Sequence, residues 1–179
     1  MHNLTEISLH SEQLVDGKLL KVYRDEVRLP DGGASIREWI DHPGAAAVVP
    51  LFEDGTTLLV RQYRYAARQT FLEVPAGKID HVGEDPEAVA VRELEEETAW
   101  RAGRLIPLGV LYPCIGYSNE RIHFYLAEAL SKVEHVRVEG EFLEVISLEF
   151  KEAVSMARRG ELSDMKTMTA LLLAEAHLA

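Results

Sequence analysis

Residues 83–100, GEDPEAVAVRELEEETAW, constrain the fold of this chain more than any other stretch. Asp85 is a favourable N-cap residue, and Pro86 follows at the first helical position, where its missing N–H costs nothing. Ala90 lies four residues before Leu94, so the two side chains would share one apolar face of a helix. The stretch therefore predicts a helix that begins at Pro86 and packs one face against a core.

The same helix would carry a dense acidic face, with glutamate at positions 93, 95, 96 and 97. Like charges three or four residues apart on a helix repel, at a cost of about 0.2–0.5 kcal/mol per pair. Arg92 can reach Glu95 and Glu96 from one turn away, which leaves Glu93 and Glu97 without a local cation. A run of this kind is most often a solvated helix face. A divalent cation, which binds carboxylate oxygens, would also balance the charge.

The segment that precedes the helix favours the second interpretation. Residues 71–74 are typical of a strand, and the loop that follows contains Gly77 and Gly83 before it enters the helix. A strand, a glycine-containing loop and a capped helix with clustered carboxylates together form a suitable pocket for a hard divalent ion.

These residues resemble the Nudix box, which reads glycine, five residues, glutamate, seven residues, arginine-glutamate, an apolar residue, any residue, two glutamates, any residue, glycine and an apolar residue. The matching positions are Gly77, Glu84, Arg92, Glu93, Leu94, Glu96, Glu97 and Trp100.

Two positions depart from the box. Six residues rather than five separate Gly77 from Glu84, and Ala99 stands in place of the second glycine. An added residue is tolerated in a loop, whereas Ala99 would carry a steric cost if the backbone there has a positive φ. Neither departure removes a carboxylate, and Arg92 and Glu84 are expected to form a salt bridge that orients the segment.

The resemblance implies a metal site on this helix. Glu93 and Glu97 would bind the ion directly, and Glu96 would complete the cluster or bind through water. The backbone carbonyl of Ala76 would add a further ligand. Because all of these ligands are hard oxygens, Mg2+ is the expected ion and Mn2+ an expected substitute.

Beyond the box, the chain resembles the ADP-ribose pyrophosphatases and related nucleoside diphosphate sugar hydrolases from about residue 15 to the C-terminus. The matching segments are REWIDHPGAAAVVP, VRQYRYAARQTFLEVPAGKID, LYPCIGYSNERIHFYLAE and EGEFLEV. Pro113 resembles a proline typical of this branch, although a plain turn explains it equally well. The resemblance implies a homodimer that hydrolyses ADP-ribose to AMP and ribose 5-phosphate.

The same resemblance places the water-activating carboxylate outside the box. Matching EFLEV to the family segment puts Glu139 at the catalytic position, with Glu141 as the alternative and Glu96 as a further catalytic candidate. The alternative interpretation is that Glu139 and Glu141 are ordinary solvent-exposed loop residues. The positions that match residues gripping the nucleotide in the ADP-ribose enzymes are Arg37, Glu38 and Arg64.

Two other functions fit the same residues. The scaffold would support hydrolysis of another nucleotide sugar, such as GDP-mannose. Folds of this kind are also reused as non-catalytic nucleotide-binding domains. The intact Glu93, Glu96 and Glu97 argue against the non-catalytic alternative.

Composition narrows the range of partners and cellular compartments expected for the chain. The net charge of −11 argues against general nucleic-acid binding, which needs clustered lysine and arginine. No apolar run approaches the roughly 20 residues needed to span a bilayer, and the first residues lack the features of a signal peptide. The one cysteine, Cys114, cannot form an internal disulfide. We therefore expect a cytoplasmic protein with a small-molecule substrate and with no membrane or nucleic-acid partner.

The remaining pattern predicts an α/β fold, a Nudix-type α/β/α sandwich with a mixed sheet and an N-terminal antiparallel β-hairpin region. Turn signals at 30–33 and 53–55 predict two hairpins. Strands are expected at 17–29, 34–40, 45–52, 56–63, 71–74, 104–112, 121–130 and 141–148, and further helices at 150–160 and 164–179, the last capped by Ser163 or Asp164. The 179 residues suit a single domain, 1–179, with 1–42 as N-terminal strands and candidate dimerisation element and 43–179 as the core.

Overall fold

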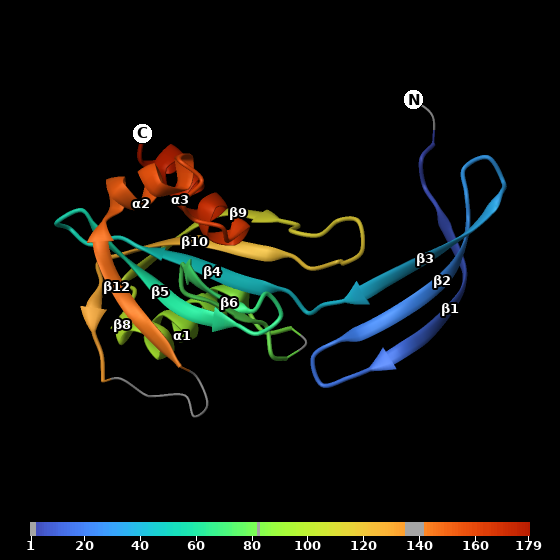
Figure 1. The fold of residues 1–179 in the computed structure, drawn as a ribbon, viewed down its shortest axis with the longest axis horizontal. Coiled ribbons are helices and arrows are strands. Elements are labelled where there is room, and N and C mark those ends of the chain that lie inside the picture. The colour runs from blue at the N-terminus through green and yellow to red at the C-terminus, as the bar shows by residue number, and fades with distance from the viewer. Residues whose placement is uncertain (1–2, 82, 135–141) are drawn as a thin grey trace.

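The computed structural model describes residues 3–81, 83–134 and 142–179. Figure 1 shows a layered body of strands and helices from which an N-terminal sheet projects. That sheet consists of β1 (Ile7–Asp16), β2 (Lys21–Arg28) and β3 (Ala34–Asp41). The strands of the body are β4 (Ala45–Pro50), β5 (Thr56–Arg64), β6 (Gln69–Glu73), β7 (Ala76–Lys78), β8 (Trp100–Arg101), β9 (Arg104–Leu111), β10 (Ile122–Glu128), β11 (Ser131–Lys132) and β12 (Leu143–Glu149). The helices are α1 (Pro86–Thr98), α2 (Phe150–Arg158) and α3 (Met165–Leu178).

The body contains two main sheets. One has the strand order β7-β4-β10-β9, in which β4 and β10 run parallel and the other pairs are antiparallel. The other is antiparallel, with the order β12-β5-β6. The mixed sheet and the helices confirm the predicted α/β class.

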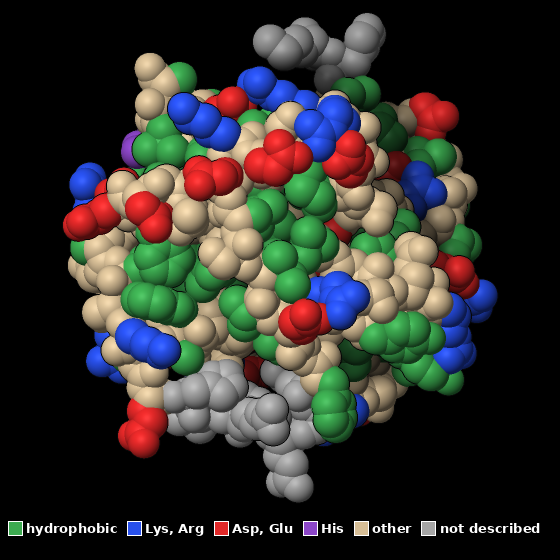
Figure 2. All heavy atoms as spheres, turned by 60° about the vertical axis from the view of Figure 1, so that its left-hand side comes forward, with side chains coloured by type: hydrophobic (Ala, Val, Ile, Leu, Met, Phe, Trp, Pro, Cys, Tyr) green, Lys and Arg blue, Asp and Glu red, His purple; other side chains and the backbone are tan. Residues whose placement is uncertain are grey.

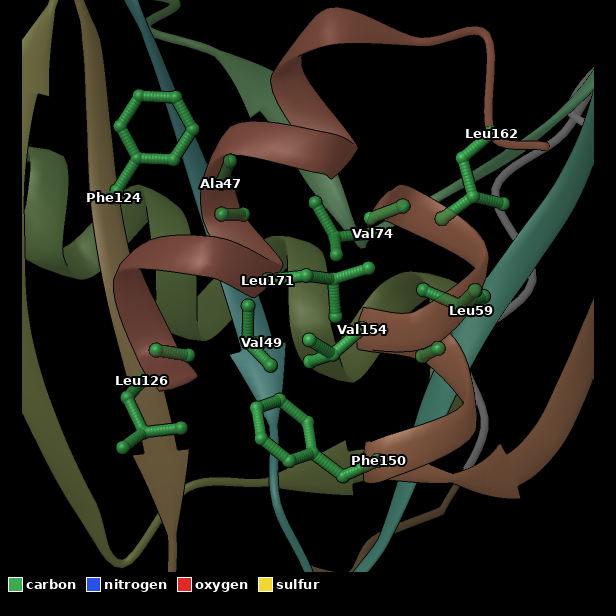
Figure 3. Close-up of a cluster of buried hydrophobic side chains, with 14 of the residues drawn as sticks. Ala47, Val49, Leu59, Val74, Phe124, Leu126, Phe150, Val154, Leu162 and Leu171 are labelled. Atoms are coloured by element: carbon green, nitrogen blue, oxygen red, sulfur yellow. The ribbon is translucent and has the colours of Figure 1, made fainter. Parts of the chain in front are cut away.

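Strand β4 has helices on both of its faces. Successive side chains of a strand point to opposite faces, and here Ala47 and Val49 join the cluster that includes α2 and α3, as the close-up in Figure 3 shows. Ala46 and Val48 join a second cluster that includes α1. A strand buried on both faces reads as a continuous apolar run rather than an alternating one, which explains the sequence AAAVVP and completes the α/β/α sandwich.

Helix α1 is built as the sequence predicts. The Asp85 side chain accepts a hydrogen bond from the backbone N–H of Glu87, and Pro86 occupies the first turn. Val89, Ala90 and Leu94 are fully buried against the β4 side of the body. The helix is therefore fixed at its start by a cap and along its length by an apolar face.

The N-terminal region differs from the prediction by one strand. The hairpin of β2 and β3 forms around the turn at 29–33, but its first strand begins at Lys21 rather than at residue 17. A further strand, β1, pairs antiparallel with β2. Because all ten residues of β1 are exposed, its sequence carries no pattern of buried and solvated positions that would reveal a strand.

The second predicted hairpin, at 45–63, is wrong. The turn forms, with the N–H of Phe52 donating to the carbonyl of Thr56, but β4 and β5 share only an isolated bridge between Leu51 and Thr57. The two strands then enter different sheets, since β4 pairs with β7 and β10 while β5 pairs with β6 and β12. A turn signal reports a local reversal of the chain and does not decide which strands pair.

The link between the N-terminal sheet and the body is held by the loop before β10. The backbone N–H of Ile40 donates to the carbonyl of Tyr117. Asn119 donates from its side-chain amide to Asp41 and accepts from the backbone N–H of His42. These bonds fix the direction in which the N-terminal sheet leaves the body.

The face at the left-hand end of Figure 1 carries acidic and basic side chains next to one another, separated by hydrophobic ones (Figure 2). Ion pairs also join different elements, such as Arg61 with Glu144 and Arg101 with Glu95. Among the described residues, no helix has the length and apolar character needed to cross a membrane.

We predict that Ala99→Gly stabilises the protein. Ala99 ends α1 in the left-handed conformation, with φ 61° and ψ 31°, where the Cβ of alanine costs roughly 1 kcal/mol relative to glycine. Urea unfolding should show a higher free energy of unfolding for Ala99→Gly. The matched change Ala88→Gly, at an exposed position inside the same helix, should lower it by up to about 1 kcal/mol. A lower stability for Ala99→Gly would contradict the steric cost assigned to alanine at the helix end.

Candidate active site

A cavity of about 370 Å³ lies where β5, β7 and α1 meet. It collects all four predicted metal-site residues and one of the three predicted substrate-binding residues. The residues that line it are Gln62, Arg64, Ala76, Gly77, Lys78, Asp80, Arg92, Glu93, Glu96 and Glu97. A larger cavity of about 900 Å³ flanks α1 and shares Arg92 and Glu96 with it. We place the site in the smaller one, because there Glu93 and Glu97 join Glu96 beside the β7 backbone.

The Glu93 carboxylate lies directly against the backbone of Gly77. A Cβ atom on Gly77 would lie 1.9 Å from Cδ and 2.0 Å from Oε1 of Glu93, far inside contact distance. Glycine is therefore the residue that lets the helix carboxylate reach the strand. This contact gives a physical reason for the first glycine of the sequence pattern.

Glu97, one turn further along α1, is held at the same strand. It is buried, and its Oε2 accepts a hydrogen bond of 3.2 Å from the backbone N–H of Ala76. Glu93 and Glu97 are thus fixed side by side over two consecutive residues of β7, which places two carboxylates where the sequence predicts them.

Arg92 balances part of the acidic charge, and its predicted pairing is confirmed for Glu96 but not for Glu95. Its Nη1 donates to Oε1 of the adjacent Glu93 at 2.7 Å and lies 3.6 Å from Oε2 of Glu96. The expected pairing of Arg92 with Glu95 is wrong, because Glu95 binds Arg101 instead. Glu93 therefore has a local cation after all.

The predicted salt bridge between Arg92 and Glu84 forms, with Nη2 3.6 Å from Oε1 of Glu84, in spite of the extra loop residue. The same Nη2 lies 3.5 Å from Oδ2 of Asp80. Burial by itself would lower the Arg92 pKa, but the carboxylates around the guanidinium outweigh burial and raise the pKa. Arg92 is accordingly a permanent cation that orders the acidic wall of the pocket.

The donor set of this pocket fits a hard divalent ion. Four carboxylates, those of Asp80, Glu93, Glu96 and Glu97, and the carbonyl groups of β7 offer only oxygen ligands, as Mg2+ and Mn2+ prefer. In the part of the chain that the structure describes, no three acidic, histidine or cysteine side chains already converge as a metal-ligand group. An ion bound at Glu93 would compete with Arg92 for that carboxylate.

Arg64 reaches the pocket wall from the end of β5. Its Nε and Nη2 donate to the two oxygens of Glu73, each at 2.7 Å. Lys166, from α3, donates to Glu73 Oε2 at 3.1 Å. Burial by itself would raise the Glu73 pKa, but the hydrogen bonds and charges of Arg64 and Lys166 outweigh it and hold the pKa below its ordinary value.

Two of the other predicted site residues, Arg37 and Glu38, are not among the residues that line this pocket. Arg37 and Glu38 lie on β3 in the N-terminal sheet, where Arg37 binds Glu6 and Glu38 binds Arg24. Glu139 and Glu141 lie outside the described residues. Their proposed roles therefore stay predictions.

Two family descriptions match consecutive parts of this chain. The description "NUDIX domain" matches residues 41–172, and "Nucleoside diphosphate sugar hydrolase N-terminal domain" matches residues 6–40. The chain belongs to the Nudix family.

Curated relatives of this Nudix protein carry different names. An ADP-ribose pyrophosphatase of Bacillus subtilis (strain 168) is 39% identical over 96% of this chain and 93% of its own length. A methanol dehydrogenase activator of Bacillus methanolicus is 37% identical over 93% of this chain and 90% of its own. A GDP-mannose pyrophosphatase of Yersinia enterocolitica serotype O:8 / biotype 1B (strain NCTC 13174 / 8081) is 36% identical over 83% and 84%.

The fold has a close counterpart among solved structures. The crystal structure of an ADP compounds hydrolase superposes with a TM-score of 0.84 and covers 98% of this chain and 96% of that one, at 22% identity. This likeness supports the Nudix fold for the whole chain, including the projecting N-terminal sheet.

Several pocket residues were missed by sequence reasoning. Gln62 lies two residues before Arg64 on β5, so strand alternation places both on one face, and this signal could have found it. Lys78, the last residue of β7, and Asp80, in the loop after it, follow Gly77. By contrast, no local signal connects Glu73 with Lys166, because the pair forms only when α3 packs next to β6.

We predict that Glu73→Gln lowers stability at neutral pH and that the loss shrinks in acid. Because the folded-state pKa of Glu73 is depressed, its ionised form stabilises the protein above the unfolded-state pKa of about 4.3, and this contribution is lost as the pH falls through the folded-state pKa. Urea unfolding at pH 7 should show a loss of about 1–2 kcal/mol. The difference between the two proteins should shrink as the pH falls through the folded-state pKa, and a difference independent of pH would contradict the ionised state of Glu73.

Proposed function

We propose that this Nudix protein hydrolyses the diphosphate bond of a nucleoside diphosphate sugar, with ADP-ribose as the substrate and AMP and ribose 5-phosphate as products. The observation that carries the proposal is that Glu93, Glu96, Glu97 and Arg64 all line one pocket beside β7. The 39% identity to an ADP-ribose pyrophosphatase over nearly the full length of both chains supports the same substrate.

In the proposed reaction, some residues of the pocket hold the metal ion and another binds the substrate. Glu93, Glu96, Glu97 and the carbonyl of Ala76 would hold Mg2+, or Mn2+ in its place. When bound, such an ion neutralises charge that builds on the diphosphate oxygens during attack by water. Arg64 would bind an anionic part of the substrate, because a guanidinium is a fixed cation with several N–H donors.

The group that activates water is assigned by resemblance. Glu139 is the first candidate, Glu141 the alternative, and Glu96, which lines the pocket, the third. A group that acts mainly in the transition state lowers kcat more than it changes KM when it is removed. Steady-state kinetics of the three glutamine variants would rank these candidates.

The proposed roles of Arg37 and Glu38 imply a second protomer. Because neither lines the pocket of its own chain, they reach a bound nucleotide only if the N-terminal sheet of one protomer lies over the pocket of its partner. The exposed apolar residues of β1, among them Ile7 at 54% and Leu9 at 49% exposure, support burial of this sheet in a homodimer. We also propose that the protein is cytoplasmic, because its single cysteine, Cys114, is unpaired, as is typical of proteins in a reducing compartment.

A second candidate substrate is GDP-mannose, favoured by the 36% identity to a GDP-mannose pyrophosphatase. A regulatory role without catalysis is the third, since a relative of 37% identity is named an activator. The complete set of carboxylates in the pocket favours catalysis, because a binding domain without chemistry has no need to crowd like charges.

A panel of nucleotide sugars assayed with and without Mg2+ tests the proposal. We expect metal-dependent release of AMP from ADP-ribose, with a higher kcat/KM than for GDP-mannose. A higher kcat/KM for GDP-mannose would select the second candidate. No turnover of any compound with Mg2+ or Mn2+ would contradict hydrolysis altogether.

We predict that Gly77→Ala removes most activity and leaves the fold intact. The added methyl group must displace the Glu93 carboxylate, which is the end of a flexible side chain, so stability should change by less than about 1 kcal/mol. Activity with ADP-ribose should fall at least roughly 10-fold, since fixed positioning of catalytic groups is worth that much or more. The control is Gly116→Ala, where no atom lies within 4 Å of the new Cβ. Full activity of Gly77→Ala would place the site elsewhere.

A further inference from the structure

Glu73 is a buried carboxylate beside the pocket that no step of the proposed reaction uses. Its side chain is 4% exposed, yet it is ionised and accepts hydrogen bonds from two cations, Arg64 and Lys166. A buried charge is costly unless it is paired and hydrogen-bonded. Residues from β5 and α3 keep this carboxylate charged although it is buried. Packing alone does not explain such an arrangement, because an apolar side chain would fill the same space without the cost of burying a charge.

The first turn of α3 holds this carboxylate in place. Asp164, the N-cap, accepts from Lys166 Nζ at 2.9 Å and from the hydroxyl of Thr167 at 2.6 Å. That hydroxyl in turn accepts from the backbone N–H of Val74 at 2.9 Å. The first turn of the helix is thereby fastened to Val74, next to Glu73, so the backbone that carries Lys166 is held beside this carboxylate.

In the described part of the chain, the geometry leaves one side of Arg64 open to a ligand. A guanidinium carries five N–H donors in a planar fork. Glu73 takes one from Nε and one from Nη2, and within the described residues Arg64 makes its hydrogen bonds through these two nitrogens. The pKa of Arg64 is raised, mainly by its hydrogen bonds to Glu73 and in smaller part by the negative charge of Glu97 in the pocket. The N–H groups of Nη1 therefore remain for an anion that enters between Arg64 and the carboxylates.

We infer that Glu73 is a positioning residue for Arg64: paired with Lys166, it fixes the guanidinium plane so that the remaining N–H groups meet the diphosphate of the substrate. This inference rests on the proposed function. An arginine already held in its binding geometry loses little side-chain freedom when the ligand arrives, and the affinity for the ligand rises accordingly.

The test is steady-state kinetics of Glu73→Gln with ADP-ribose and Mg2+, measured well below the melting temperature. The amide keeps the size of the side chain but turns one acceptor into a donor that faces a cation. We expect kcat/KM to fall roughly 10- to 100-fold, as for loss of a hydrogen bond to a charged group, and mainly through a higher KM. The control is Glu161→Gln, which breaks the same Nε/Nη2 fork on exposed Arg159 and should leave both constants unchanged.

A double-mutant cycle separates positioning from mere stability. Arg64→Lys keeps a positive charge but cannot form the fork with Glu73. If Glu73 acts through Arg64, adding Glu73→Gln to Arg64→Lys should change kcat/KM by less than about twofold. The same loss in both backgrounds would show that Glu73 acts independently of Arg64, and the inference would fail.

Glu73→Asp covers the case in which Glu73→Gln does not fold. It keeps the buried charge and withdraws the carboxylate from Arg64 by one methylene, so KM should still rise. A wild-type KM in either variant would overturn the inference while leaving the proposed function in place. Absence of turnover by the wild-type protein would contradict the proposed function itself.

Discussion

The contact between the Glu93 carboxylate and the backbone of Gly77 is the constraint on which the site depends. It requires that a helix and a short strand approach closely enough for a side-chain carboxylate to occupy the place of a Cβ atom. That approach is secured by the cap at Asp85, by burial of Leu94 and by the sheet that holds β7 next to β4. The neighbouring glutamates of α1 are thereby held in fixed positions. Glu93 lies against Gly77, and Glu97 accepts a hydrogen bond from Ala76.

Partly buried polar contacts extend this order to both sides of the pocket. On the helix side, Arg92 is shared among Glu93, Glu96 and Glu84. On the strand side, Arg64 is held by Glu73, which is held by Lys166 from α3. The C-terminal helix therefore contributes to a pocket that none of its residues lines. Each arrangement couples a guanidinium to carboxylates at a fixed distance, and such preorganised charge is what diphosphate chemistry requires.

Most of the body could be predicted from local pattern. Asp85 and Pro86 marked the start of α1, and the apolar run at 45–52 marked the strand that the structure shows as β4. The parts that were missed lack such signals. Strand β1 is exposed along its whole length, so its sequence does not alternate between apolar and polar residues. The turn signal at 53–55 predicts a chain reversal, but it does not indicate that β4 and β5 enter different sheets.

The sequence by itself determined the composition of the acidic wall, since Glu93, Glu96 and Glu97 share a helix and their spacing is covalent. It also determined where Gly77 and Ala76 stand relative to them along the chain. Only the tertiary structure decided that Arg92 binds Glu93 rather than Glu95, that Ala76 donates to Glu97, and that Lys166 meets Glu73 across 93 residues. Contacts of that kind depend on how layers pack, and packing is a property of the whole chain rather than of any window of it.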